Sequence, residues 1–139
     1  MTKMIFVNLP VADLPAAMAF YEAIGFTNNP IFTDDTAACM VWSEAISVML
    51  LTHDKWKSFT DRPIPDRGSS EVMLCVNCDD RGAVDALVEA GAANGGMADI
   101  QPPQDHGFMY QRTIIDPDGH VWEPMWMDME AAAVSAAEM

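Results

Sequence analysis

The stretch Asp116-Pro-Asp-Gly-His-Val-Trp-Glu123 carries the most informative local pattern in this 139-residue chain. Pro117 and Gly119 supply the backbone angles of a tight turn, so strands are predicted on both sides of it. These strands are expected near residues 108–115 and 120–128. The two aspartates of the turn are not followed by more oxygen donors at the spacing of a calcium loop, which favours a simple turn. His120 is expected on the surface beside it.

The residues before this turn predict a strand, a helix and a further strand. Residues 71–78 alternate, with an apolar face formed by every second side chain, as a half-buried strand does. Asp79 or Asp80 is then the N-cap of a helix. A short strand is expected near residues 97–100. The second half of the chain therefore predicts one strand, one helix and three strands.

The first half predicts the same order of elements. Its helix has Asp13 as N-cap and ends at Gly25. The predicted strands are 4–11, 30–33, 37–43 and 46–53. The two halves are offset by roughly 65 residues, a period too long, with too few copies, for a solenoid. The fold class is therefore α+β, with two βαβββ modules joined as a pseudo-symmetric pair of curved sheets.

The predicted modules define a simple domain organisation. One domain covers residues 1–128, with modules at about 4–53 and 71–128. The linker 54–70 contains two prolines, Pro63 and Pro65, and several charged residues, with a possible helical turn around Trp56. Residues 129–139 are an alanine-rich C-terminal tail.

The charge of the chain excludes some classes of partner. Asp and Glu number 21 against 7 Lys and Arg, which gives a net charge of −14. Nucleic acids and anionic membrane surfaces require basic patches, so neither is an expected partner. Cationic ligands remain compatible because the field of the protein attracts them. Four basic side chains gather in the linker and are candidates for receiving an anionic group: Lys55, Lys57, Arg62 and Arg67.

The cysteines favour a reducing compartment. Three cysteines, Cys39, Cys75 and Cys78, are an odd number in a chain that is 50% hydrophobic and can build an ordinary core. Cys75 and Cys78 have redox spacing, but on a strand their side chains point to opposite faces. No apolar run reaches the roughly 20 residues of a membrane helix. The expected location is cytoplasmic.

Two stretches resemble the glyoxalase/bleomycin-resistance/extradiol-dioxygenase superfamily, also called vicinal oxygen chelate proteins. The first is Phe6-Val-Asn-Leu-Pro-Val-Ala-Asp13, followed by Ala19-Phe-Tyr21 and Gly25-Phe26; the second is the 116–123 stretch. The resemblance covers about residues 4–128 and is nearest to small bacterial lactoylglutathione-lyase-like proteins. It implies a glyoxalase-like fold in which the two modules form a cup, a homodimer, and a small-molecule ligand.

The resemblance also implies four positions at which the superfamily's enzymes hold a divalent metal. Carried over residue by residue, these positions fall on Phe6 in the first strand and Met49 in the fourth. In the second module they fall on Glu71 and Glu123. Catalytic metal sites normally need about three protein ligands. No cofactor is therefore expected, and Glu71 and Glu123 are metal ligands only if a metal binds.

Alternation along the strands predicts which side chains line the cup. Trp56, in the linker, is an additional ligand-binding candidate. The predicted lining is Phe6, Asn8, Met49, Leu51, Glu71, Met73, Glu123 and Met125.

Any chemistry is expected to use Glu123 together with Glu71 or His106. Two carboxylates inside a cup would shift each other's pKa and could serve as an acid–base pair. His106 lies in the Gln104–Gly107 loop and is a candidate base, while His53 ends a strand near the cup rim.

Three functions remain open from the sequence. The first is a superfamily protein that binds an apolar small molecule in the cup, with chemistry, if any, of the lyase or isomerase type. The second is a non-catalytic drug-sequestering protein of the bleomycin-resistance type. The third is a metal-dependent lyase or isomerase with unusual ligands.

Overall fold

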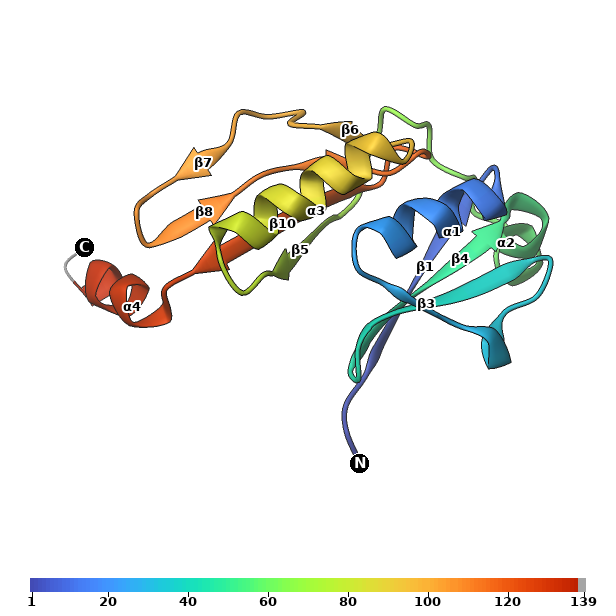
Figure 1. The fold of residues 1–139 in the computed structure, drawn as a ribbon. Coiled ribbons are helices and arrows are strands. Elements are labelled where there is room, and N and C mark those ends of the chain that lie inside the picture. The colour runs from blue at the N-terminus through green and yellow to red at the C-terminus, as the bar shows by residue number, and fades with distance from the viewer. Residues whose placement is uncertain (138–139) are drawn as a thin grey trace.

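Two modules, each a sheet with one long helix, make up the computed structural model, which describes residues 1–137 (Figure 1). The strands of the first sheet are β1 (Ile5–Val11), β2 (Thr27–Asn29), β3 (Ala37–Ser43) and β4 (Ile46–Thr52), and they lie in the order β1-β4-β3-β2. Strand β1 is parallel to β4, and the other neighbours are antiparallel. Helix α1 (Leu14–Ala23) follows β1.

The second sheet is built around its longest strand, β10 (Val121–Met127). This strand is parallel to β5 and antiparallel to β8 and β9, whose outer neighbours are β7 and β6. Helix α3 (Arg81–Ala93) follows β5. The remaining strands are β5 (Met73–Asn77), β6 (Met97–Ala98), β7 (Gln104–Asp105), β8 (Met109–Gln111) and β9 (Ile114–Ile115). The predicted α+β fold with two βαβββ-type modules is confirmed.

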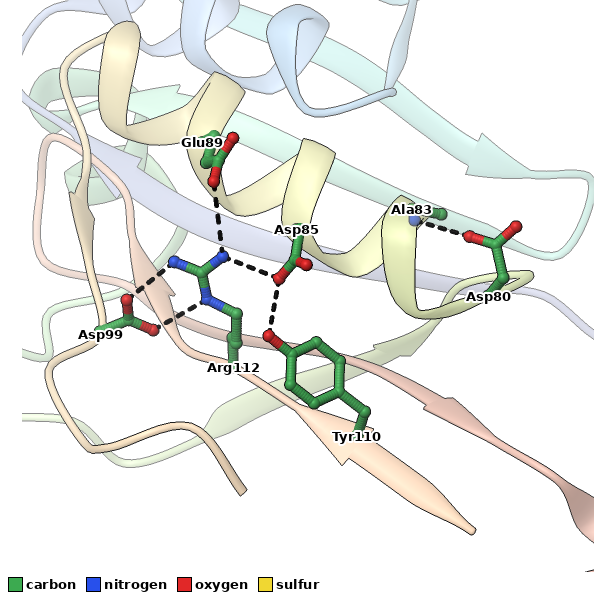
Figure 2. Close-up of polar contacts among 7 residues, drawn as sticks. All are labelled: Asp80, Ala83, Asp85, Glu89, Asp99, Tyr110 and Arg112. Atoms are coloured by element: carbon green, nitrogen blue, oxygen red, sulfur yellow. Dashed lines mark hydrogen bonds and ion pairs between the residues drawn. The ribbon is translucent and has the colours of Figure 1, made fainter. Parts of the chain in front are cut away.

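Both long helices begin at the predicted caps. An Oδ1 atom of Asp13 accepts the Ala16 N–H at 3.0 Å. Asp80, one of the two predicted residues, accepts the Ala83 N–H at 2.7 Å (Figure 2). Each bond satisfies one of the amide groups that a helix leaves free at its start.

Two predicted strands differ from the structure. The prediction of a strand at residues 30–33 is wrong, because Pro30–Phe32 forms the 3-10 helix η1. Asn29 directs this turn, since its Oδ1 accepts the Ile31 N–H at 3.1 Å. The strand expected at 108–115 is divided into β8 and β9.

The segments outside the modules contain two short helices. Helix α2 (His53–Phe59) occupies the start of the predicted linker, where Thr52 Oγ1 accepts the Lys55 N–H at 3.2 Å. Helix α4 (Met129–Ala137) occupies the predicted tail, of which residues 138–139 lie outside the described part of the chain. None of the helices within residues 1–137 is long and apolar enough to span a bilayer.

The core lies between the sheets and the two long helices, which pack against each other on the same side of the molecule (Figure 1). The close approach of the modules needs a residue without a side chain at Gly91, because a Cβ there would lie 2.9 Å from the Ile114 side chain and 3.0 Å from Phe20. The buried residues contributed by the sheets and helices include Leu9, Val11, Phe20, Tyr21, Met40, Leu50, Val84, Val88, Ile114 and Trp122.

A buried hydrogen-bond network joins the two modules. Tyr21 of α1 donates its hydroxyl proton to Asp116 Oδ2 at 2.7 Å, and Trp122 Nε1 donates to the Tyr21 hydroxyl at 2.9 Å. The other carboxylate oxygen, Oδ1, accepts the N–H groups of Asp118 and His120, both at 2.9 Å. Burial raises the pKa of Asp116, and burial followed by the charge of Asp116 raises the pKa of Tyr21 well above its ordinary value.

The turn after Asp116 extends this connection to β1. Asp118 Oδ1 accepts the Ala12 N–H at 2.8 Å, and His120 Nε2 lies 2.8 Å from the Pro10 carbonyl oxygen, to which it can donate. His120 is therefore a half-buried link between the modules, and the prediction that it lies free on the surface is wrong.

Candidate functional site

The first sheet presents a face away from α1 that carries three of the predicted cup residues. Leu9 and Val11 of β1 are buried in the core, so Phe6 and Asn8 point to the opposite face. Asn8 pairs with Met49 of β4, which places Met49 on the same face. Phe6 is 52% exposed there.

The corresponding face of the second sheet carries the remaining strand candidates. Val76 and Trp122 are buried on the core side, so Met73, Glu123 and Met125 lie on the other. Glu123 pairs with Cys75 across β10 and β5. Burial, and next the charge of Glu123, raise the pKa of the Cys75 thiol, which keeps it protonated.

The register of the two modules changes one carried-over metal position. The helix N-caps Asp13 and Asp80 are 67 positions apart, so the counterpart of Phe6 in β5 is Met73 rather than Glu71. The pairing agrees, because Asn8–Met49 in the first module then matches Cys75–Glu123 in the second. Three of the four metal positions that the resemblance implies thus fall on Phe6, Met49 and Met73.

These residues do not fit the metal that the fold family implies. A phenyl ring offers no donor, and a thioether is neither the thiolate, imidazole nor carboxylate that a catalytic Zn²⁺ site uses, nor the oxygen donor that Mg²⁺, Ca²⁺ or Mn²⁺ prefers. Glu123 alone keeps a carboxylate at its position. Among residues 1–137, no group of three or more His, Cys, Asp or Glu side chains could hold a metal ion.

The three candidate catalytic residues lie at different levels of the second sheet. Glu123 pairs with Cys75 of β5. Glu71 lies four residues before Cys75, which corresponds to about 13 Å of extended chain. His106 lies in the hairpin beyond Met109, which pairs with Met127 at the other end of β10. The structure does not bring these three side chains together.

The predicted ligand-binding residues Leu51 and Trp56 have different surroundings from the candidates on the exposed faces of the strands. Leu51 ends β4 beside α2 and is only 1% exposed, so it contributes to packing. Trp56 of α2 lines a cavity of about 610 Å³ between the two modules. Asn8, His53 and Glu71 line the same cavity.

The sequence did not predict this cavity, because distant segments form it. Its lining comes from β1, α2, the start of β5 and the turn before β10, and from residues 64–72. We name residues 64–72 the strap. Gly119 is the one residue of the turn that reflects this contact. Its φ is +89°, and a Cβ there would lie 2.3 Å from the Arg67 carbonyl oxygen. This glycine therefore permits the strap to lie directly on the turn.

Arg81 fixes the hairpin that carries His106. Its guanidinium donates to both oxygens of Asp105, at 2.7 and 2.8 Å, and to the Gly107 carbonyl at 2.9 Å. It also lies over the rings of Tyr110 and Trp126, 5.2 Å from each centroid. These contacts hold the hairpin against the start of α3.

Arg81 lowers the pKa of Asp105 to about 2 from its ordinary value of 3.8, chiefly through these hydrogen bonds. The contribution of this pair to stability is therefore present above about pH 3.8 and is lost as the pH falls towards 2. We expect Arg81→Gln to raise the midpoint of the Asp105 carboxyl titration towards 3.8, as measured by carbon-detected NMR. An unchanged midpoint would show that Arg81 is not the cause.

Comparison with known proteins supports the superfamily resemblance. Residues 3–43 match the family described as bleomycin resistance protein-like N-terminal. No curated protein matches the sequence. A hypothetical protein from S. aureus superposes with a TM-score of 0.76 at 24% identity, over 91% of this chain and 94% of that one.

Two further solved structures have the same architecture. A glyoxalase/bleomycin resistance protein/dioxygenase family enzyme from Burkholderia phytofirmans gives a TM-score of 0.73 at 20% identity, covering 91% of this chain and 99% of that one. A bleomycin-binding protein, whose structure was solved in complex with bleomycin, superposes with a TM-score of 0.62 at 21% identity. The match covers 91% of this chain and 100% of that one.

The chain therefore has the fold of the glyoxalase/bleomycin-resistance/dioxygenase superfamily, in agreement with the superfamily resemblance found in its sequence. At these identities the solved structures establish the architecture alone.

Proposed function

We propose that this protein binds an apolar small molecule on its cup face, without a catalytic metal. The cup face comprises Phe6, Asn8, Met49, Met73, Glu123 and Met125. One observation supports the proposal: the apolar side chains Phe6, Met49 and Met73 fall at three of the four positions that the resemblance implies for metal ligands. Apolar side chains that are exposed or partly exposed on these strands provide the surface on which an apolar ligand loses contact with water.

Binding is favoured over chemistry because the candidate acid–base residues lie apart. General acid–base catalysis requires the donor and acceptor within hydrogen-bond reach of one substrate. Glu123 has Cys75 as its cross-strand neighbour, and that thiol has a raised pKa. A metal-dependent lyase or isomerase would need donors that Phe6, Met49 and Met73 do not supply.

The proposal is tested by metal content and by a neutral apolar dye. Protein purified without a metal-affinity tag is expected to retain well under one Zn, Ni, Mn or Fe per chain after incubation and gel filtration. Nile red is expected to bind, and Met73→Asp to weaken its binding about tenfold, because the carboxylate must lose water beside the ligand.

Val134→Asp, on α4, also replaces an exposed apolar side chain with a carboxylate, outside both sheets, and is the matched control. One tightly held metal per chain, or equal dye binding by Met73→Asp and wild type, would contradict the proposal.

A second candidate is a drug-sequestering protein of the bleomycin-resistance type. The N-terminal family match and the net charge of −14 favour it, since an acidic protein concentrates cations at its surface. Titration with bleomycin at low and high salt tests this candidate function. Binding that weakens with added salt supports drug sequestration, and the absence of binding rules out bleomycin sequestration.

We also propose a homodimer in a reducing compartment, such as the cytoplasm. Phe6 and Met73, 52% and 63% exposed, are large apolar side chains that a second copy would partly cover. The three cysteines are free thiols. Gel filtration with light scattering should give twice the 15.2 kDa chain mass, and a single-chain mass would exclude the dimer.

A further inference from the structure

The cavity between the modules is a separate space from the cup face. Of the cup-face residues only Asn8 lines it. It lies between β1 and the turn that precedes β10, and the strap runs along it. Its volume of about 610 Å³ falls within the range of pockets that hold drug-sized molecules.

The strap is held in a defined position. Ser69 donates its N–H to the Asp66 carbonyl at 2.9 Å, which closes a turn within the strap. The Arg67 backbone lies directly on Gly119, where only glycine leaves room. The cavity is therefore bounded by ordered backbone from both modules and belongs to a single chain.

The walls of the cavity combine apolar surface with negative charge. Leu9, Leu74 and Val121 contribute aliphatic surface from three strands, and Trp56 adds an aromatic ring. The Trp56 Nε1 also makes a long hydrogen bond, 3.4 Å, to the Arg62 carbonyl oxygen. The charged lining residues are three carboxylates and one guanidinium: Asp66, Glu71, Asp118 and Arg67.

Glu71 is the carboxylate best placed to pair with a ligand. Asp118 already accepts the Ala12 N–H at 2.8 Å, and Asp66 accepts the Gly68 N–H at 3.3 Å. Within residues 1–137 no ion pair involves Glu71 or Arg67. An ammonium group beside Glu71 would gain a charge-assisted hydrogen bond, and an aromatic ring such as Trp56 also attracts cations.

We propose that this cavity is a binding site, within one chain, for an organic cation with an apolar or aromatic body, and that Glu71 is its counter-ion. The site goes beyond the proposed function, since it does not use the apolar cup face. The strongly acidic protein raises the local concentration of such cations.

Two probes that share one ring system and differ in charge test this site. Naphthalen-1-ylmethylammonium and 1-naphthoate are titrated into the full chain by calorimetry at low salt. We expect the cation to bind at one per chain, and the anion to bind at least tenfold more weakly. Glu71→Gln should weaken cation binding about tenfold, and added salt should weaken it as well.

Glu22→Gln is the matched control, because it removes the same charge from an exposed position on α1 that does not line the cavity. Cation affinity equal to wild type in this variant supports the site, whereas a loss as large as that of Glu71→Gln overturns it. Equal affinity for the two probes, or no binding of the cation, also overturns it.

Nile red separates this site from the cup face. Met73→Asp is expected to reduce dye binding without weakening the binding of the cation. If the dye result fails while the cation result holds, only the proposed function is lost; the reverse pattern removes only the cavity site.

Discussion

Replacing Tyr21 with phenylalanine is expected to lower the free energy of unfolding by about 3 kcal/mol, although only one oxygen atom is removed. The Tyr21 side chain is fully buried, and its hydroxyl is both the acceptor for Trp122 Nε1 and a donor to Asp116. Its loss leaves the Trp122 N–H without an acceptor and removes one donor from a buried carboxylate. Urea unfolding followed by circular dichroism measures the change.

Tyr110→Phe is the matched control for this variant. The Tyr110 hydroxyl also donates to a carboxylate, Asp85, at 2.7 Å, but Asp85 is partly exposed to water and has a second partner in Arg112. Its loss is expected to cost less than about 1 kcal/mol. If the two variants lose similar stability, the buried network does not join the modules as described.

Replacing Arg112 with methionine is expected to cost about 2 kcal/mol, since three carboxylates would lose their shared cation. Arg112 is 13% exposed and donates to both oxygens of Asp99, at 3.1 and 2.8 Å, and to Asp85 at 2.9 Å (Figure 2). Glu89 lies 4.0 Å away. The exposure of these acidic partners limits the loss, because water screens part of their repulsion. Thermal and urea unfolding measure it.

The backbone of Asp99 gives this prediction a second, independent check. Asp99 has a φ of +56°, in the left-handed region that favours glycine. In the Arg112→Met background, Asp99→Gly should restore part of the lost stability, because it removes one repelling charge and a strained backbone position. The exposed Lys57→Met is expected to change stability by less than about 0.5 kcal/mol. A further loss on adding Asp99→Gly would contradict this account.

The sequence predicted the repeated elements because local rules determine them. Asp13 and Asp80 cap helices through hydrogen bonds to amide groups within the next three residues. The alternation of side chains along the strands placed Phe6, Met49 and Glu123 on the faces of the sheets opposite the core. The 3-10 helix at Pro30–Phe32 was missed because the side chain of Asn29 competes with strand pairing.

The parts that could not be predicted depend on contacts between distant residues. The shift from Glu71 to Met73 required the register of β5, which its pairing with β10 fixes. The cavity requires the strap, β1 and the Asp116–Gly119 turn at once, and no local pattern reports their meeting. His120 looked like a surface residue because its partner, the Pro10 carbonyl, is 110 positions away.

The order of synthesis gives the Tyr21 network a further consequence. Tyr21 and Asp116 are 95 residues apart, and Trp122 lies 101 residues after Tyr21. Contacts of such long separation form slowly, because a large loop must close before they contribute. We therefore expect that the nascent chain cannot bury the Tyr21 hydroxyl against its partners until Trp122 has emerged from the ribosome. Until then the side of α1 that packs on α3 would stay exposed, and a chaperone would have a surface to protect.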